Sequence, residues 1–454
     1  MEVTMRCDRL ILCGVLFTAQ FARTSAVADE SVIWAFRGYK GQGSQPLGNV
    51  IARKSGFYGT TSGLGSAAKN HISKGTAFKI SPSQNGWKLE DLHVFQGGTD
   101  GANPFAGLVE GANGRLYGTT VGGGATSLKK GAYAAGTVFE LTPPASSGGK
   151  WSETIIYAFP QYGLANPAGA LTVGPGGGLY GTAEQGGSAG FGGVFALSPP
   201  AKGGTTWTET TLYNFSGGLD GGQPVAALIT DASGALYGTT RTGGINIDGD
   251  DCSGLGNGSG CGVVFKLTPP EQGQTAWSES VLYSFTGGAD GAEPLCALVS
   301  DSSGALYGTT EYGGIVGNPG VVFKLTPPGN GQTQWTDTTI YQFQGYPTDG
   351  EFPVAGLVFG SNGSLYGTTL GGGTEDGGTV FDLSPPQAGQ TSWTESIVYT
   401  FQGGAIGKEP TDGAEPAASL LIDDSGNIIG TTSKGGGQGP GGAGNYGTVF
   451  EISP

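Results

Sequence analysis

Few side chains in this 454-residue sequence are of the types that perform acid–base or metal chemistry at neutral pH. It has two histidines, and His71 lies between two predicted strands, where an imidazole can act as a general base or contact a ligand. His93 takes the tyrosine position of a repeated segment, so we expect it to be structural. The sequence contains no His-Glu-x-x-His motif, nucleophile elbow or Ser-His-Asp order. These observations assign no catalytic residues.

A second group of candidates occupies the longest connection between two predicted strands. Its polar members are Asn246, Asp248, Asp250 and Asp251. Their spacing partly resembles a calcium loop, although Asp251 stands where the sharp turn needs glycine, so calcium is the one cofactor that the sequence leaves open. Cys252 and Cys261 in the same connection are expected to form a local disulfide in an oxidising compartment. Cys296 instead takes an alanine slot of the repeat, which predicts a small buried side chain.

Aspartates that precede glycine recur at one point of the repeat and allow two interpretations. They are Asp100, Asp220, Asp290, Asp349 and Asp412. Five carboxylates around one rim could bind cations or act as acids and bases. The favoured interpretation is that each aspartate caps its own turn by accepting backbone N–H groups, because a residue repeated in so many units is more typical of architecture.

Aromatic residues outside the repeat are the remaining candidates for ligand contact. Six of the seven tryptophans precede a recurring phenylalanine by eight residues, and Trp34 takes a tyrosine position, so packing explains all seven. The aromatic residues left in or near the variable connections are Tyr133, Phe191, Tyr312, Tyr346 and Tyr446. With His71 and the polar residues of the long connection, they form the candidate binding set.

A repeated pentapeptide predicts the scaffold that positions these residues. Leu-Tyr-Gly-Thr-Thr, or a close variant, occurs seven times at intervals of 57 to 70 residues, centred on Tyr58, Tyr117, Tyr180, Tyr237, Tyr307, Tyr366 and Ile429. Around Tyr307 the short apolar segments 278–285, 295–299, 306–310 and 321–325 are rich in β-branched and aromatic residues and are bounded by Gly, Pro or Asn, which predicts strands. Four-stranded units repeated in this way predict an all-β fold, a seven-bladed β-propeller.

The two ends of the chain predict how the ring closes. The last repeat stops after its third strand at residues 447–454, whereas residues 29–36 align with the fourth-strand segment 152–159. We therefore expect the N-terminal segment to pair with the C-terminal third strand, which leaves no open sheet edge there.

Loop lengths separate an architectural face from a variable one. The recurring phenylalanines of the third and fourth strands lie 20 residues apart in five successive units, whereas the step from the pentapeptide glycine to the third-strand phenylalanine varies from 14 to 27 residues. The variable connections between second and third strands emerge around one mouth of the central channel. This rim is the candidate functional face, because binding residues concentrate on loops held by a rigid scaffold.

The first 28 residues predict export. Arg6 and Arg9 precede the apolar run 10–22, and residues 26–28 are small, which is typical of a cleaved secretory signal. The run is too short for a transmembrane helix, and Leu12 before Cys13 argues against a lipoprotein, so we expect a mature single domain, 29–454, without membrane insertion. The formal net charge of −15 disfavours nucleic acid and acidic membrane partners, and we expect a monomer.

The motif pair Leu-Tyr-Gly-Thr-Thr-x-x-Gly-Gly and Gly-Thr-Val-Phe-x-Leu-[Ser/Thr]-Pro resembles the Gloeobacter/Verrucomicrobium-type (GloVer) tandem-repeat proteins over essentially the whole mature chain. The resemblance implies an exported bacterial protein and transfers no catalytic residues. Many relatives end in a surface anchor, whereas this sequence ends inside a repeat, so we expect release outside the cell or into the periplasm. The favoured function is a scaffold that binds a protein or glycan at its variable rim. The alternative is a lyase or hydrolase of an extracellular polymer with rim carboxylates as acid and base, disfavoured because other titratable groups are scarce.

Overall fold

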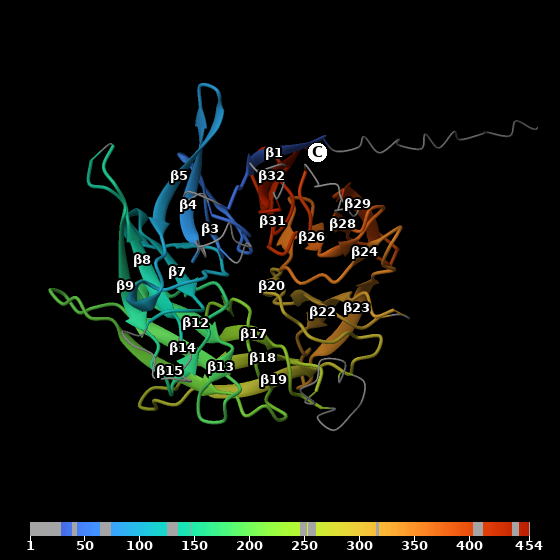
Figure 1. The fold of residues 1–454 in the computed structure, drawn as a ribbon. Coiled ribbons are helices and arrows are strands. Elements are labelled where there is room, and N and C mark those ends of the chain that lie inside the picture. Colours follow the sequence, from blue (N-terminus) through green and yellow to red (C-terminus); the bar gives the residue numbers. More distant parts are fainter. Residues whose placement is uncertain are drawn as a thin grey trace, which may run out of the picture.

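A computed structural model describes residues 29–38, 43–63, 74–124, 135–146, 148–245, 252, 260–314, 317–402, 412–437 and 445–453. Within these residues, seven antiparallel four-stranded sheets stand as blades around a central channel (Figure 1). This arrangement confirms the predicted all-β propeller. No helix in the described ranges has the length and apolar character needed to cross a membrane.

The strands of each blade follow one another from the channel outward. Blades 1 to 4 consist of β2 (Ile51–Arg53), β3 (Gly56–Thr61), β4 (Thr76–Ser83), β5 (Gly86–Val94); β6 (Val109–Glu110), β7 (Leu116–Thr120), β8 (Thr137–Thr142), β9 (Ser152–Ala158); β11 (Thr172–Val173), β12 (Leu179–Ala183), β14 (Gly193–Ser198), β15 (Thr208–Asn214); and β16 (Ile229–Thr230), β17 (Leu236–Thr240), β18 (Val263–Thr268), β19 (Ser278–Ser284). Blades 5 to 7 consist of β20 (Val299–Ser300), β21 (Leu306–Thr310), β22 (Val321–Thr326), β23 (Thr336–Gln342); β25 (Val358–Phe359), β26 (Leu365–Thr369), β28 (Thr379–Ser384), β29 (Thr394–Thr400); and β30 (Leu421–Ile422), β31 (Ile428–Thr432), β32 (Thr448–Ser453), β1 (Asp29–Ala35).

Short elements decorate the connections. Two extra two-stranded sheets pair β10 (Leu164–Ala165) with β13 (Gln185–Gly186) and β24 (Gly350–Glu351) with β27 (Gly371–Gly372). Among the described residues, single-turn 3₁₀ helices are η1 (Gly98–Asp100), η2 (Ala112–Gly114) and η3 (Pro175–Gly177).

Hydrogen bonds from one repeated threonine tie each blade to the next. The hydroxyl of the first threonine of Thr-Thr donates to a backbone carbonyl of the innermost segment of the following blade, and these threonines are buried. The seven pairs are Thr60–Ala106 at 2.7 Å, Thr119–Gly169 at 3.2 Å, Thr182–Ala226 at 2.8 Å, Thr239–Cys296 at 3.0 Å, Thr309–Ala355 at 3.1 Å, Thr368–Ala418 at 3.5 Å and Thr431–Gly48 at 3.3 Å. The pentapeptide is therefore an inter-blade connector.

The predicted innermost strand, residues 295–299 in blade 5, was too long. The ladder begins only at Val299, because residues 295–297 line the channel and the carbonyl of Cys296 accepts the hydroxyl of Thr239 from the preceding blade. The second strand of the same blade, Leu306–Thr310, matches its predicted bounds.

Apolar cores form between blades as well as within them. Phe285 of blade 4 packs edge-to-face on Phe323 of blade 5 at 5.1 Å between ring centroids, and a corresponding phenylalanine pair lies at each of the other six interfaces. This pairing explains the glycine of the pentapeptide, because a Cβ on Gly308 would lie 2.6 Å from the Phe323 ring. Each interface is thus a small core that neither blade could bury alone.

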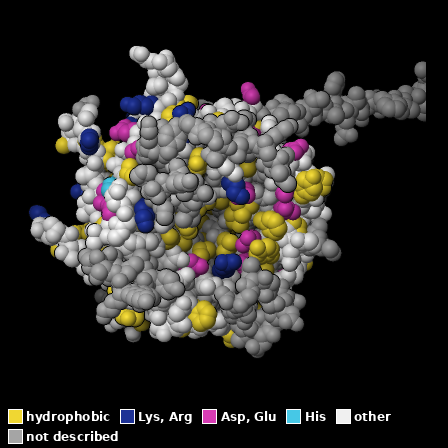
Figure 2. Space-filling model, viewed as in Figure 1, with side chains coloured by type: hydrophobic (Ala, Val, Ile, Leu, Met, Phe, Trp, Pro, Cys, Tyr) yellow, Lys and Arg dark blue, Asp and Glu magenta, His cyan; other side chains and the backbone are white. Residues whose placement is uncertain are grey.

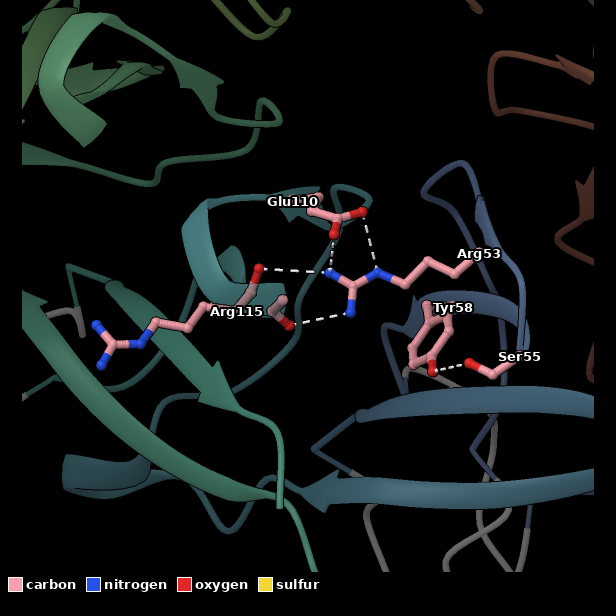
Figure 3. A network of polar contacts seen from close by, with 6 residues as sticks. Arg53, Ser55, Tyr58, Glu110 and Arg115 are labelled. Carbon is pink, nitrogen blue, oxygen red and sulfur yellow. Dashed lines mark hydrogen bonds and ion pairs between the residues drawn. The ribbon is translucent and has the colours of Figure 1, made fainter. Parts of the chain in front are cut away.

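Polar contacts add to the interface between blades 1 and 2 (Figure 3). Arg53 of blade 1 makes a two-pronged ion pair with Glu110 of blade 2, with Nε and Nη2 each 3.1 Å from a carboxylate oxygen. Its Nη1 donates to the carbonyl of Gly114 at 3.0 Å, and its guanidinium lies 5.2 Å from the centroid of the Tyr58 ring. A single arginine therefore joins two blades through an ion pair and a hydrogen bond, while its contact with Tyr58 lies within blade 1.

The ring closes as predicted. β1 pairs antiparallel with β32, from Asp29 opposite Ser453 to Ala35 opposite Thr448. The Phe36 N–H donates to the carbonyl of Gly447 at 3.0 Å, and the side chains of Ile33 and Phe36 are buried. Pairing the two ends of the chain completes blade 7.

Candidate functional site

Most of the predicted loop candidates lie outside the described residues. These are His71, Tyr133, Asn246, Asp248, Asp250 and Asp251, which remain predictions, as does the signal at residues 1–28. The predicted disulfide is confirmed, with Cys252 and Cys261 bonded at a Cα–Cα distance of 5.3 Å. Cys296 is a buried free thiol, as expected.

The other aromatic candidates do not converge: Tyr346 is exposed, whereas Phe191, Tyr312 and Tyr446 are half-buried. Phe191 and Tyr446 occupy the same position in different blades, just before a third strand, and each covers a glycine of the following turn. A Cβ on Gly217 would lie 2.6 Å from the Phe191 ring, and one on Gly38 would lie 2.4 Å from the Tyr446 ring. Tyr312 instead packs edge-to-face on Phe352, with ring centroids 5.7 Å apart. Only Tyr312 therefore joins the site built below.

The repeated aspartates cap their own turns, as the favoured interpretation held. Asp290 accepts the Thr286 N–H at 2.8 Å and the Tyr283 hydroxyl at 3.0 Å. Equivalent backbone bonds reach Asp100, Asp220, Asp349 and Asp412. Each of these aspartates therefore uses one carboxylate oxygen to cap its own turn.

Two positions in each blade place variable side chains at the mouth of the channel. One is the residue just before the proline that opens the channel-lining segment, and the other directly follows Thr-Thr. A backbone hydrogen bond joins the two, for example from the Glu311 N–H to the carbonyl of Glu293 at 3.1 Å. We call these fourteen positions the mouth positions.

The residues before proline share an unusual backbone conformation. All seven have positive φ between 54° and 60°, and none is glycine: Gln45, Asn103, Asn166, Gln223, Glu293, Phe352 and Glu415. A left-handed conformation is uncommon for non-glycine residues and costs on the order of 1 kcal/mol or more. The fold holds it in every blade, so each of these side chains starts from the same backbone geometry.

A charged cluster fills the mouth positions of blades 3 to 5. Arg241 Nε lies 2.8 Å from an oxygen of Glu293, whose side chain is 6 % exposed, and Asn166 donates to Glu184. Burial raises the pKa of Glu184, Glu293 and Glu311, although the positive charge of Arg241 acts in the opposite direction on all three. Three carboxyls thus converge on one guanidinium.

An apolar patch adjoins the charged cluster. Phe352 and Leu370 take the two mouth positions of blade 6, both half-buried, and the Tyr312 ring contacts Phe352. Seen from this face, the molecule is hollowed at its centre, and hydrophobic, acidic and basic side chains gather at the edge of the hollow (Figure 2). The mouth is therefore apolar on one side and charged on the other.

The remaining mouth positions are less distinctive. Blade 7 contributes Glu415, which is paired with Lys434 and accepts the Ser433 hydroxyl at 3.3 Å. Blades 1 and 2 contribute the uncharged Gln45, Ser62, Asn103 and Val121.

Behind the mouth lies a cavity of about 570 Å³ lined by segments from all seven blades. Small residues such as Gly48, Ala106 and Gly169 occur at the same inner position, where their carbonyls accept the inter-blade threonine hydroxyls. The channel wall is thus nearly uniform, and chemical variety is concentrated at the mouth.

The charged cluster and Phe352 were not predicted from the sequence, because the predicted candidates were residues of the long loops that differ from the repeat. A signal was present: in the position after Thr-Thr, the units carry Ser62, Val121, Glu184, Arg241, Glu311, Leu370 and Ser433. Such variety beside a dipeptide that is Thr-Thr in six units and Thr-Ala in one marks a surface free to specialise.

Comparisons with known proteins extend this description. The sequence model of the Gloeobacter/Verrucomicrobia repeat matches residues 12–249 and 125–334. The comparison with curated proteins found no match. Among solved structures, a protein assigned as a 6-phosphogluconolactonase from Bacteroides uniformis is 13 % identical, with TM-score 0.45, covering 77 % of this chain and 84 % of its own. The family 93 α-L-arabinofuranosidase of Fusarium graminearum with arabinobiose is 15 % identical, with TM-score 0.41, covering 76 % and 91 %. A luciferin-regenerating enzyme is 12 % identical, with TM-score 0.40, covering 75 % and 87 %.

Proposed function

Because this chain belongs to the Gloeobacter/Verrucomicrobia repeat family, we propose that it is an exported propeller that binds a neutral or amino-sugar glycan at the mouth of its channel. The observation that carries the proposal is the pairing of an apolar patch, Phe352, Leu370 and Tyr312, with the charged cluster around Arg241. Ligand sites commonly combine apolar side chains, which supply contact area, with a few polar groups, which fix orientation. The disulfide between Cys252 and Cys261 supports residence in an oxidising compartment.

The chemistry of the mouth favours a saccharide. The apolar C–H face of a sugar ring can lie on Phe352 and Tyr312, while its hydroxyl groups can donate to Glu293 or Glu311 and accept from Arg241. Three carboxyls against one guanidinium give the cluster an acidic balance, and the whole chain carries −15. An anionic polymer would be repelled, whereas a neutral or protonated amino sugar would not.

Binding is tested by titrating the mature protein with neutral, amino-sugar and uronic-acid oligosaccharides in a calorimeter. Phe352→Asn is the key variant, because asparagine occupies the same position at Asn103 and Asn166 with the same positive φ, so the fold should accept it. We expect it to weaken binding at least about tenfold, equivalent to about 1.4 kcal/mol. Val281→Ala, on the outer strand β19 and outside the mouth positions, is the control and should leave affinity unchanged. Binding confined to uronic acids, equal affinity in Phe352→Asn and wild type, or no saccharide binding would each overturn the proposal.

A second function, cleavage of the bound glycan, is favoured by one observation. Burial raises the pKa of Glu184, Glu293 and Glu311, and a raised pKa is a property of the carboxyls that act as general acids on a leaving oxygen. Product analysis after long incubation separates the two functions. Turnover that is lost in Glu311→Gln while affinity is retained would establish the enzyme, and retention of intact glycan would support the binding protein.

A further inference from the structure

Four outer interfaces between blades share a side-chain pattern that is altered by a histidine at the interface of blades 1 and 2. In the recurring arrangement, a fourth-strand tyrosine donates its hydroxyl to the turn aspartate that follows, and a carboxyl from the next blade approaches the same aspartate. The four examples are Tyr213 with Asp220 at 3.1 Å and Glu279, Tyr283 with Asp290 at 3.0 Å and Asp337, Tyr341 with Asp349 at 2.8 Å and Glu395, and Tyr399 with Asp412 at 2.8 Å and Glu30. Between blades 1 and 2 the tyrosine is replaced by His93, which faces Asp100 and Glu153.

The three groups at this interface are close enough to share an ion. Nε2 of His93 lies 2.9 Å from Oδ1 of Asp100, and one ligand atom from each of His93, Asp100 and Glu153 falls within 4.8 Å of the others. All three residues are half-buried, with the His93 and Asp100 side chains 21 % and 23 % exposed, so solvent can reach the cluster. One oxygen of Glu153 is buried and has no hydrogen-bond partner among the described residues.

The exchange of tyrosine for histidine changes what the cluster can hold. A neutral phenol is a hydrogen-bond donor to the aspartate, whereas an imidazole nitrogen also offers a lone pair that borderline metal ions prefer. Two carboxylates that repel each other across the interface gain from a cation placed between them. The unpartnered oxygen of Glu153 supplies a free ligand atom.

From this geometry we propose that His93, Asp100 and Glu153 bind a divalent transition-metal ion of the zinc class, bridging blades 1 and 2. One nitrogen and two carboxylate oxygens make three protein ligands, and a water molecule would complete a tetrahedral set. When metal is bound, the proton of the imidazole resides on Nδ1, because Nε2 faces the two carboxylates. The site lies between the outer strands β5 and β9, so it does not depend on the proposed glycan site.

The test uses metal-stripped mature protein titrated with Zn²⁺ in a calorimeter, and with Co²⁺ to follow the visible absorption of a low-coordinate site. We expect one Zn²⁺ per chain at micromolar or tighter affinity and a melting temperature that rises with Zn²⁺. His93→Tyr restores the side chain of the other interfaces and should fold, yet lose at least about 100-fold in affinity. His71→Ala should bind as the wild type does, which assigns the ion to His93 among the two histidines.

A gain-of-function variant completes the design. Tyr213→His places an imidazole opposite Asp220 and Glu279, where Glu279 also has a buried oxygen without a hydrogen-bond partner in the described structure, and should create a second zinc site. Absence of zinc binding by the wild type, equal affinity in His93→Tyr, or loss of binding in His71→Ala would overturn the proposal.

Discussion

Removal of residues 29–36 is expected to lower the melting temperature by at least about 10 °C and to broaden the unfolding transition. The deletion removes the outermost strand of blade 7, exposes the edge of β32, and takes Phe36 from its contact with Phe78 at 5.1 Å. Loss of the buried Ile33 and Phe36 side chains alone costs about 1.5–3 kcal/mol each. The deletion destabilises both blade 7, which loses a strand, and blade 1, which packs against blade 7.

Circular dichroism and calorimetry on residues 29–454 and 37–454 measure the effect, and a synthetic peptide of residues 29–36 added in excess should restore much of the lost stability. Thr431→Val and Thr309→Val provide matched comparisons, since they remove the same inter-blade hydrogen bond at the closing interface and at an ordinary one. Each should cost about 1–2 kcal/mol. Unchanged stability of the deleted chain would show that the ring does not depend on pairing between its ends.

The repeat predicted the architecture well because strand segments are local and periodic. The second strand Leu306–Thr310 was placed at its observed bounds, and closure followed from aligning residues 29–36 with a fourth strand that otherwise lacked a counterpart at the C-terminal end. In both cases, apolar side chains bounded by turn residues specify the element. Such signals need no knowledge of neighbouring blades.

Features decided by neighbouring blades were predicted less well. Residues 295–298 have the composition of a strand but not its ladder, because the carbonyl of Cys296 is claimed by Thr239 of another blade, 57 residues away. The mouth cluster has the same origin. Glu184, Arg241 and Glu293 are far apart in sequence, and only the packing of blades 3, 4 and 5 brings them together.

His93 illustrates how a repeat can both hide and reveal a site. Its place in a strand favoured a structural role, and the structure does pack its ring on Phe95 at 4.8 Å. Tyr213, Tyr283 and Tyr341 occupy the equivalent position in other blades. His93 differs from them in placing an imidazole, instead of a phenol, beside two carboxyls. Departures from the repeat are informative only when the side chains surrounding each copy are also compared.

The second large effect is a dependence of folding stability on pH. In buffer that contains a chelator, we expect the free energy of unfolding to fall as pH rises from about 5 to about 8. At the interface between blades 3 and 4, Glu279 faces Asp220, which already accepts the hydroxyl of Tyr213 at 3.1 Å. Burial, with repulsion from Asp220, raises the pKa of Glu279 to about 7. Burial and a neighbouring carboxylate likewise raise the pKa of Glu30, Asp337 and Glu395 to about 7.

The direction follows from proton linkage. Unfolded glutamate and aspartate titrate near about 4, so between about pH 4 and pH 7 the folded ring binds more protons than the unfolded chain. The stabilisation from the protonated carboxyls is complete below the unfolded pKa and is lost as pH rises through about 7, after which stability levels off. Asp231 and Asp301 have the opposite effect on stability at low pH. Burial raises their pKa, but hydrogen bonds from neighbouring Ser and Tyr side chains and backbone N–H groups outweigh it, so the pKa of each is lowered. The stability that these two carboxylates contribute is therefore lost as pH falls below about 4.

Glutamine substitution separates this mechanism from general charge repulsion. Glu279→Gln and Glu395→Gln mimic the protonated acid, so each should raise the melting temperature at pH 8 by about 1 °C, for about 1 kcal/mol after allowance for partial exposure, and change little at pH 5. Glu271→Gln removes the same charge at an exposed position and serves as the control. If the interface variants and Glu271→Gln shift the melting temperature equally, or if the wild type is as stable at pH 8 as at pH 5, the interface carboxyls do not hold their protons in the folded ring. In that case the pH response would come from the net charge of the protein and not from carboxyl groups placed between the blades.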